Sequence, residues 1–165
     1  MMRYALLTLA LVVPLTAASA QAKKPGAHTQ RAVTVALPDQ MTWGPAPAVL
    51  PAGAKLAVLE GDPTKSGAFT MRLLMPDGYQ ISPHFHPATE HVTVVSGALL
   101  VGMGEKFDES QMKTLPAGAF GMIPAGMHHY AKANGETVLQ LHGIGPWRLI
   151  YVNKADDPRK KVAAM

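Results

Sequence analysis

The sequence of 165 residues contains no cysteine, so the protein cannot form a disulfide bond. Its stability must come from a hydrophobic core, a bound ion or association with another chain. No stretch shows a convincing apolar period of 3.6 residues, which is the pattern of an amphipathic helix. No apolar run is long enough to span a bilayer comfortably. These absences exclude a disulfide-stabilised fold and argue against a mainly helical one.

The sequence also lacks a concentrated basic patch, although Lys and Arg outnumber Asp and Glu by 15 to 11. Two basic clusters, at 23–24 and 159–161, lie near the two ends of the chain. Neither cluster is interleaved with the aromatic side chains on which nucleic-acid bases stack. We therefore expect solvated termini and no nucleic-acid partner.

Residues 1–20 have the pattern of a secretory signal peptide. Arg3 supplies a positive charge, residues 5–15 form a short apolar core, and the small residues at 18–20 resemble a cleavage site. We expect cleavage after Ala20, export across the inner membrane of a bacterium, and a periplasmic or secreted mature protein with no membrane contact. The alternative is an uncleaved amphipathic or buried N-terminal helix.

The residues that would remain after cleavage, about 145, suffice for one domain with a sizeable core. Residues 21–54 are rich in proline, glycine and alanine, which predicts a partly extended N-terminal arm. Within this arm the alternating segment 32–37 could add an edge strand to the domain or pair with a second subunit. We place the domain at 55–153 and a C-terminal tail at 154–165.

Short runs bounded by turn residues predict strands throughout the domain. Residues 55–61 and 68–75 are two such runs, with turn residues at 62–66 and 76–78. Regular spacing of short strands and turns is typical of sandwiches and barrels. The sequence therefore predicts an all-β fold.

Residue types that bind metals gather within residues 78–97. His84 and His86 stand two apart, so in an extended chain both imidazoles project from one side and Phe85 projects from the other. Glu90 follows four residues after His86. Two neutral imidazoles and a carboxylate are a suitable ligand set for a divalent first-row metal.

A second stretch, residues 118–134, supplies a further candidate ligand, His129. Three histidines and one glutamate would hold a divalent ion and leave coordination positions free for water, dioxygen or a chelating substrate. His128 precedes His129, and only one of the two can point inward. If the turn at 124–127 shifts by one residue, they exchange roles.

The spacing in both stretches matches a pair of sequence motifs. The first, G-x5-H-x-H-x3-E-x6-G, occupies residues 78–97, and the second, G-x5-P-x-G-x2-H-x3-N, begins at Gly118. The second motif departs from its pattern at the end, because Ala133 takes the place of the final asparagine and Asn134 comes one position late. On these motifs the region of about 55–153 resembles the cupin superfamily.

The resemblance implies a single-domain jelly-roll barrel, also called a double-stranded β-helix. It also implies that one divalent metal ion per chain is held by His84, His86, Glu90 and His129. In proteins of this superfamily the ion is commonly iron, manganese, nickel, copper or zinc. Members include dioxygenases, oxalate-acting enzymes, isomerases, germin-like proteins and simple binding modules, and the fold does not choose among them.

Asn134-Gly135 is a strong signal for a two-residue hairpin of type I′, because both central positions of that turn need positive φ. A tight turn there would pair His129 with Gln140 and Met127 with His142. Cross-strand partners share a face, so Gln140 and His142 would face the site, where they would orient the substrate or shuttle a proton. A bulge or a three-residue turn would reverse this assignment.

Ser96-Gly97 predicts a second tight hairpin, in which Glu90 pairs with Met103. His91 would then point outward, away from the site. The inner face would carry Glu90 and, below it, the aliphatic residues Val92, Val94, Leu99 and Val101. This arrangement predicts a polar site at one end of the barrel and an apolar floor beneath it.

We expect a metal-dependent oxidoreductase of the dioxygenase type that acts on a small oxygen-rich or aromatic molecule. The absence of a second carboxylate as general base weakens an oxalate decarboxylase interpretation. One alternative is a non-catalytic protein that binds or senses a metal or small ligand in the periplasm, and another is a structural dimer stapled by its ion. A homodimer is expected in any case, because Leu139 and Leu141 would otherwise be exposed on the outer face.

Overall fold

The structure, a computed structural model, describes residues 33–162 of the chain. The predicted signal peptide lies outside the described residues. The strands are β1 (Gly44–Pro45), β2 (Lys55–Glu60), β3 (Gly67–Met75), β4 (Gln80–Phe85), β5 (Glu90–Met103), β6 (Lys113–Pro116), β7 (Phe120–Ile123), β8 (His129–Gly145) and β9 (Ile150–Tyr151). The helices are short: the 3-10 turns η1 (Pro38–Gln40), η2 (Glu109–Gln111) and η3 (Lys154–Asp156), and α1 (Pro158–Val162). Within residues 33–162 no helix is long and apolar enough to cross a membrane.

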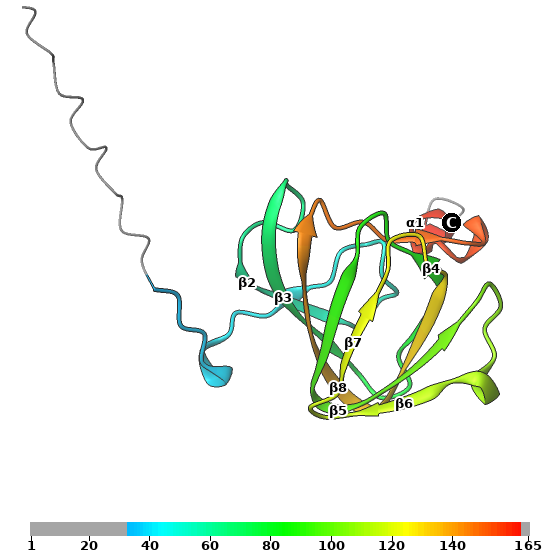
Figure 1. Cartoon of the computed structure of the whole chain (residues 1–165), viewed down its shortest axis with the longest axis horizontal. Coiled ribbons are helices and arrows are strands. Elements are labelled where there is room, and N and C mark those ends of the chain that lie inside the picture. The colour runs from blue at the N-terminus through cyan, green and yellow to red at the C-terminus, as the bar shows by residue number, and fades with distance from the viewer. Residues whose placement is uncertain (1–32, 163–165) are drawn as a thin grey trace, which may run out of the picture. The chain divides into compact units, whose positions relative to one another are not determined.

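The strands form two curved layers that share the two longest strands, β5 and β8. In the first layer β2, β3 and β7 flank residues 137–145 of β8 and 90–94 of β5. In the second layer β4, β6 and β9 flank residues 129–134 of β8 and 98–103 of β5. Figure 1 shows the layers facing each other and meeting where β5 and β8 bend. The all-β prediction is confirmed.

Gly97 lies at the bend of β5, where the pairing with β8 changes register on both sides of Ser96. Its φ of +74° is in the left-handed region, which glycine adopts without a steric penalty. A Cβ at residue 97 would collide with the backbone oxygen of Glu136 and would lie 2.7 Å from Thr137 Oγ1. The fully buried Thr137 hydroxyl accepts a hydrogen bond from the N–H of Ala98 at 3.3 Å. Gly97 therefore allows β5 and β8 to pack closely as the chain passes from one layer to the other.

The structure has bends within long strands where the sequence predicts two hairpins. β8 continues through Asn134, which lacks the positive φ that a type I′ turn requires. Gly135 does have a positive φ, and its N–H donates a hydrogen bond to Asp77 Oδ1 at 2.8 Å. β5 likewise continues through Ser96-Gly97. The hairpin predictions are wrong because β5 and β8 pair with each other along most of their lengths, and this long-range pairing outweighs the local turn signals.

A strand that does not reverse keeps its alternation of side chains. Leu139 and Leu141, predicted to face outward, are therefore on the same face of β8 as His129, and each is only 4% exposed. Their predicted need for cover by a second subunit is wrong. In β5 the bend shifts the alternation by one residue, so the predicted inner residues Glu90, Val92, Leu99 and Val101 do face the interior.

Residues 33–37, in the described part of the N-terminal arm, form no strand. Val33 and Val35 are 90% and 74% exposed. The edge strand is thus not formed within one chain, and its pairing with a second subunit stays a prediction. The arm joins the sheet at β1, which pairs with β2. The hydroxyl of Tyr151 donates to the carbonyl of Val49 at 2.8 Å, which holds the arm against the second layer.

Candidate metal centre

His84 and His129 lie side by side on neighbouring strands of the second layer. They are register partners between β4 and β8, and their ring centroids are 4.1 Å apart. His86 follows the end of β4, and its ring lies 5.1 Å from that of His84 and 5.3 Å from that of His129. One ring nitrogen of each buried histidine lies within 4.8 Å of the other two. This spacing is close enough for the three imidazoles to hold one metal ion.

The turn that precedes β8 attaches one motif to the other. The N–H of Gly126 donates a hydrogen bond to the carbonyl of His86 at 2.8 Å, and the N–H of Met127 donates to the carbonyl of Pro124 at 3.1 Å. The proline and glycine of the second motif thus form a turn that binds the backbone of the first. This contact fixes where His129 enters the site relative to His86.

All three imidazoles are oriented by backbone carbonyl groups. A carbonyl oxygen can only accept a hydrogen bond, so each Nδ1 must carry the proton and each Nε2 keeps its lone pair for a ligand. Such support of the second ring nitrogen is usual for metal-binding histidines. The Nδ1 contacts are His84 to Ser82 O at 2.8 Å, His86 to Arg148 O at 2.6 Å, and His129 to Met127 O at 3.0 Å.

Glu90 brings a carboxylate from the first layer to the histidines of the second. Its Oε2 lies 3.4 Å from His86 Nε2 and 3.7 Å from His129 Nε2. Its other oxygen, Oε1, accepts a hydrogen bond from the indole N–H of Trp147 at 3.2 Å. The Trp147 ring also stacks on His86 with centroids 5.3 Å apart. The two layers therefore meet at this site, where Trp147 contacts both Glu90 and His86.

Burial keeps the imidazoles neutral. It lowers the pKa of His86 to about 4, and it lowers the pKa of His84 and of His129, with further lowering of both by neighbouring histidines. Neutral imidazole is the form that binds a metal ion, so the three rings are ready to act as ligands at neutral pH.

The surroundings of Glu90 and His86 fit a cation. Burial raises the pKa of the Glu90 carboxyl, and the positive charge of an ion would offset that cost of ionisation. The Nε2 atom of His86 is buried and has no hydrogen-bond partner among the described residues. A buried polar atom without a partner is costly, and a metal ion would satisfy it. The residues present therefore fit a divalent metal ion.

We predict that the metal-free protein becomes less stable as the pH falls from 7 to 4. The unfolded chain takes up a proton on His86 near its ordinary pKa of 6.5, whereas the folded chain takes it up only near pH 4. The loss of unfolding free energy from this residue reaches about 3 kcal/mol at the acidic end. Glu90 acts in the opposite sense, because its raised pKa stabilises the folded state at low pH and that contribution is lost as the pH rises.

Urea unfolding of the chelator-treated protein at several pH values measures this decline. In a His86→Phe variant the decline should be smaller, because the proton uptake of His86 has been removed. An equal decline in the variant and the wild type would contradict the assignment to His86.

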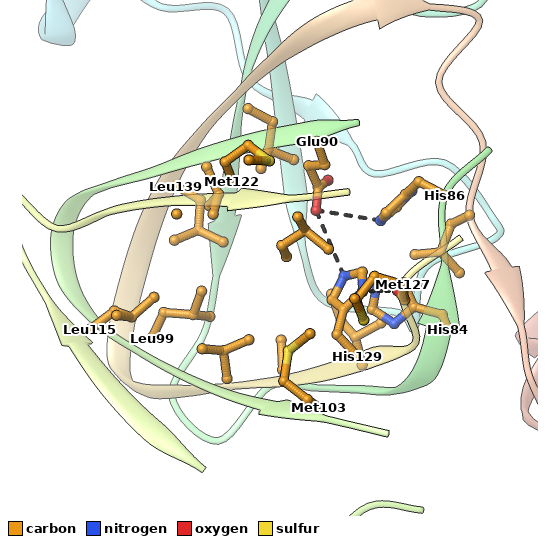
Figure 2. A pocket seen from close by; sticks show the side chains of 18 of the residues that line it. His84, His86, Glu90, Leu99, Met103, Leu115, Met122, Met127, His129 and Leu139 are labelled. Carbon is orange, nitrogen blue, oxygen red and sulfur yellow. Dashed lines mark hydrogen bonds and ion pairs between the residues drawn. The ribbon is translucent and has the colours of Figure 1, made fainter. Parts of the chain in front are cut away.

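A cavity of about 690 Å³ opens next to the four polar residues. Figure 2 shows His84, His86, Glu90 and His129 gathered at one end, with leucine side chains at the other. Met103 and Met127 lie near the histidines. Most of the remaining wall is aliphatic or aromatic, including Leu73, Ile81, Val92, Leu99, Val101, Leu115, Ile123, Leu139, Leu141, Trp147 and Leu149. The site can therefore take a small, mostly apolar molecule beside the histidines.

The structure does not bring Gln140 or His142 to this cavity. Gln140 accepts a hydrogen bond from Arg72 Nε at 3.2 Å, and His142 stacks on His91 with ring centroids 4.9 Å apart. The prediction that Gln140 and His142 face the site is wrong. The prediction depended on a hairpin at Asn134-Gly135. Without that reversal, Gln140 and His142 lie on the face of β8 opposite to Leu139 and Leu141, which line the cavity.

Two other histidines adjoin the site in sequence without entering it. His91 does not line the cavity, in agreement with its predicted outward direction, and it packs between His142 and Phe120. His128 Nδ1 lies 3.2 Å from a carboxylate oxygen of Glu105. The structure thus brings His129, and not His128, to the other two imidazoles.

Sequence reasoning missed two features of the site: the hydrogen bond from Trp147 to Glu90 and the backbone carbonyls that hold the imidazoles. Trp147 follows the end of β8 and is far from Glu90 and His86 in sequence. From the sequence, a large ring after a Gly-Pro turn could cap the cavity, lie at a subunit contact or pack in the core. No local pattern identifies it as a hydrogen-bond donor to Glu90.

Several solved structures have a fold similar to that of this chain. A protein from Methylibium petroleiphilum, proposed to be an acetylacetone dioxygenase, is 19% identical, with a TM-score of 0.59 over 79% of this chain and 88% of its own. The polyketide cyclase RemF from Streptomyces resistomycificus is 13% identical, with a TM-score of 0.59 over 80% of this chain and 94% of its own. An RmlC-like cupin from Shewanella frigidimarina is 18% identical, with a TM-score of 0.53 over 72% and 96%. The fold is that of the cupin superfamily, as its motifs predicted.

The sequence of the chain also matches a protein family. Residues 58–149 match the family described as a domain of unknown function, DUF4437, and the chain belongs to that family. Germin-like protein 5-1 of rice is 43% identical over 56 residues, which are 33% of this chain. The match spans 25% of the rice protein's own length.

Proposed function

We propose that the protein binds one divalent metal ion through His84, His86, Glu90 and His129 and acts as an oxidoreductase of the dioxygenase type. The observation that carries this proposal is the convergence of three oriented, neutral imidazoles beside a carboxylate at the end of an apolar cavity. A bound ion would supply Lewis acidity toward the oxygen atoms of a substrate and, if it is redox-active, electrons for the reduction of dioxygen.

The lining of the cavity narrows the class of substrate. The apolar wall offers few hydrogen-bond partners, so a molecule with many hydroxyl groups would lose its hydration without compensation. An aromatic or alkyl molecule with oxygen atoms at one end would place those oxygens at the histidines and its apolar part in the cavity. Alkyl diketones and catechols have this form, whereas small dicarboxylic acids do not.

The residues of the chain would have distinct tasks in such a reaction. The carbonyls of Ser82, Arg148 and Met127 would keep the three Nε2 lone pairs directed at the ion. Trp147 would hold the Glu90 carboxylate and cover one side of His86. The apolar wall would exclude water from the reacting end of the substrate.

We expect the protein loaded with Fe(II) or Mn(II) to consume oxygen with a diketone or catechol and not with a small dicarboxylic acid. An oxygen electrode and a panel of the three classes measure this. His84→Ala should reduce the rate to background, because one of three neutral ligands is lost. His142→Ala is the matched control and should retain the rate, since His142 lies on the outer face.

The competing function is a non-catalytic protein that stores or senses a metal or small ligand. It would be supported if the loaded wild type bound a diketone or catechol yet consumed no oxygen with any member of the panel. Metal-dependent melting alone does not separate the two functions, because any bound ion stabilises the folded state by mass action.

We also propose that the protein is exported and forms a homodimer. Export follows from the signal-peptide pattern of residues 1–20. For the dimer, Phe120 and Ile144 are 59% and 63% exposed and flank the stacked pair His91 and His142 on the first layer. Exposed apolar side chains around such a pair favour burial against a second copy. Separation of periplasmic from cytoplasmic proteins would test the location, and light scattering of the purified mature protein would measure its mass in solution.

A further inference from the structure

Apart from the four residues of the metal centre, two side chains in the cavity wall can bind a polar group. They are Gln111, at the end of η2, and Lys113, at the start of β6. Both belong to one short segment of the chain. The remaining lining residues have apolar side chains or none, and Trp147 already donates its N–H to Glu90.

The register of β6 directs Lys113 toward the cavity. Lys113 pairs with Val101 and Leu115 pairs with Leu99, and all four residues line the cavity. The intervening Thr114 does not line it. Cross-strand partners share a face and alternate residues share a face, so the side chain of Lys113 starts from the inner face of the second layer.

The acidic residues that precede β6 are engaged elsewhere. Glu109 forms an ion pair with Lys132 at 2.6 Å, and Asp108 accepts hydrogen bonds from the N–H and the hydroxyl of Ser110 at 3.0 and 2.6 Å. Lys113 itself forms no ion pair with any residue in the range 33–162. It is exposed at the rim of the cavity, where its charge is available to a ligand.

The separation between Lys113 and the histidines can be estimated from the strand pairing. Lys113 pairs with Val101, and Val101 pairs with Ala131, two residues after His129 on β8. The backbones of Lys113 and His129 are therefore separated by two inter-strand spacings across the sheet and by two residues along a strand. Together these place them about 12 Å apart. A small elongated molecule can therefore reach both.

We propose that Lys113, with Gln111 beside it, binds a carboxylate at the end of the substrate opposite its metal-binding oxygens. The substrate class is then an apolar or aromatic molecule with a chelating head and an acidic tail. This inference rests on the proposed function, because it concerns the same cavity. Lys113 acts as a specificity residue and takes no part in the reaction at the metal centre.

The test uses the full mature protein loaded with zinc, which binds without supporting oxygen chemistry, and calorimetric titration with paired probes. One probe is an alkyl β-diketone with a terminal carboxylate and two to six methylene groups, and the other carries a methyl group in place of the carboxylate. The wild type should bind the acid about tenfold more tightly, as expected for one charge-assisted hydrogen bond at a partly exposed site. The preference should shrink at high salt.

Lys113→Met should abolish the preference and leave the affinity for the neutral probe unchanged, and Lys113→Arg should restore it. Lys106→Met is the matched control, because it removes the same charge from a residue that does not line the cavity. Equal binding of the two probes by the wild type, a preference that survives in Lys113→Met, or no binding of either probe would overturn the inference. Oxygen consumption without a preference would leave the proposed function standing and reject this inference. A preference that depends on Lys113, in a protein that consumes no oxygen with any probe, would support this inference and reject the proposed function.

Discussion

Replacing His86 by glutamine is expected to remove metal binding almost completely. The wild type should retain about one divalent ion per chain after dialysis, and the variant should bind at least a hundredfold more weakly. Loss of a residue that merely supports a ligand costs ten- to a hundredfold, and loss of the ligand itself should cost no less. His86 is the most telling position, because its Nε2 is buried without a hydrogen-bond partner while its Nδ1 is held by Arg148.

The same substitution should remove the stabilisation that the ion provides. At an ion concentration a hundred times the dissociation constant, binding raises the unfolding free energy by about 2.7 kcal/mol. The wild type should therefore lose about this amount when a chelator is added, and His86→Gln should lose almost nothing. Metal content by elemental analysis and urea unfolding with and without chelator measure the two effects.

His128→Ala is the matched control for this experiment. His128 adjoins a proposed ligand in sequence, yet its ring faces Glu105 outside the cavity. The His128→Ala variant should bind metal as tightly as the wild type does. If His128→Ala lost the ion and His86→Gln kept it, the assignment of the ligands would be wrong.

Gly97→Ala is expected to destabilise the protein by about 3 to 5 kcal/mol, enough to prevent folding of a marginally stable domain. An alanine in the left-handed region costs about 1 to 2 kcal/mol. The rest comes from overlap of the new methyl group with the backbone of Glu136 and with Thr137, which lie at the bend of β8. Neither neighbour can move without separating the two longest strands.

Gly135→Ala separates the cost of backbone strain from the cost of steric overlap. Gly135 and Gly97 have the same φ of +74°, but a Cβ at residue 135 has no atom within 4 Å. This variant should lose only the 1 to 2 kcal/mol of backbone strain. Urea unfolding of both variants measures the difference, and equal losses would show that packing between β5 and β8 contributes nothing at Gly97.

These glycines also show why the two hairpins were mispredicted. Positive φ is required at Gly97 and Gly135, and the sequence indicates this correctly in both cases. A single glycine with positive φ can end a strand in a tight turn or bend it through a bulge, and the local sequence does not distinguish these outcomes. The choice depends on the pairing of β5 with β8, whose partners are far apart in the chain.

The bend in β5 and the bend in β8 had different consequences for the predicted site. In β5 the bend shifts the alternation by one residue, as a tight hairpin would, so Glu90 and the aliphatic floor were placed on the correct face. In β8 the alternation continues unbroken, so Gln140 and His142 were placed on the wrong face, as were Leu139 and Leu141. A shift of one residue exchanges the two faces of a strand, which is why one error in a turn displaced four side chains.

The spacing of His84, His86, Glu90 and His129 and the turn residues between them are properties of the chain, and they were sufficient to indicate the fold class and a possible metal site. Folding alone decided which groups surround these four: the carbonyl of Arg148 at His86, the indole of Trp147 at Glu90, and the apolar cavity that Lys113 overlooks. The physical reason is that short spacings determine which side chains share a face of a strand. Contacts between layers depend on backbone pairing between distant segments, and a local pattern does not encode that pairing.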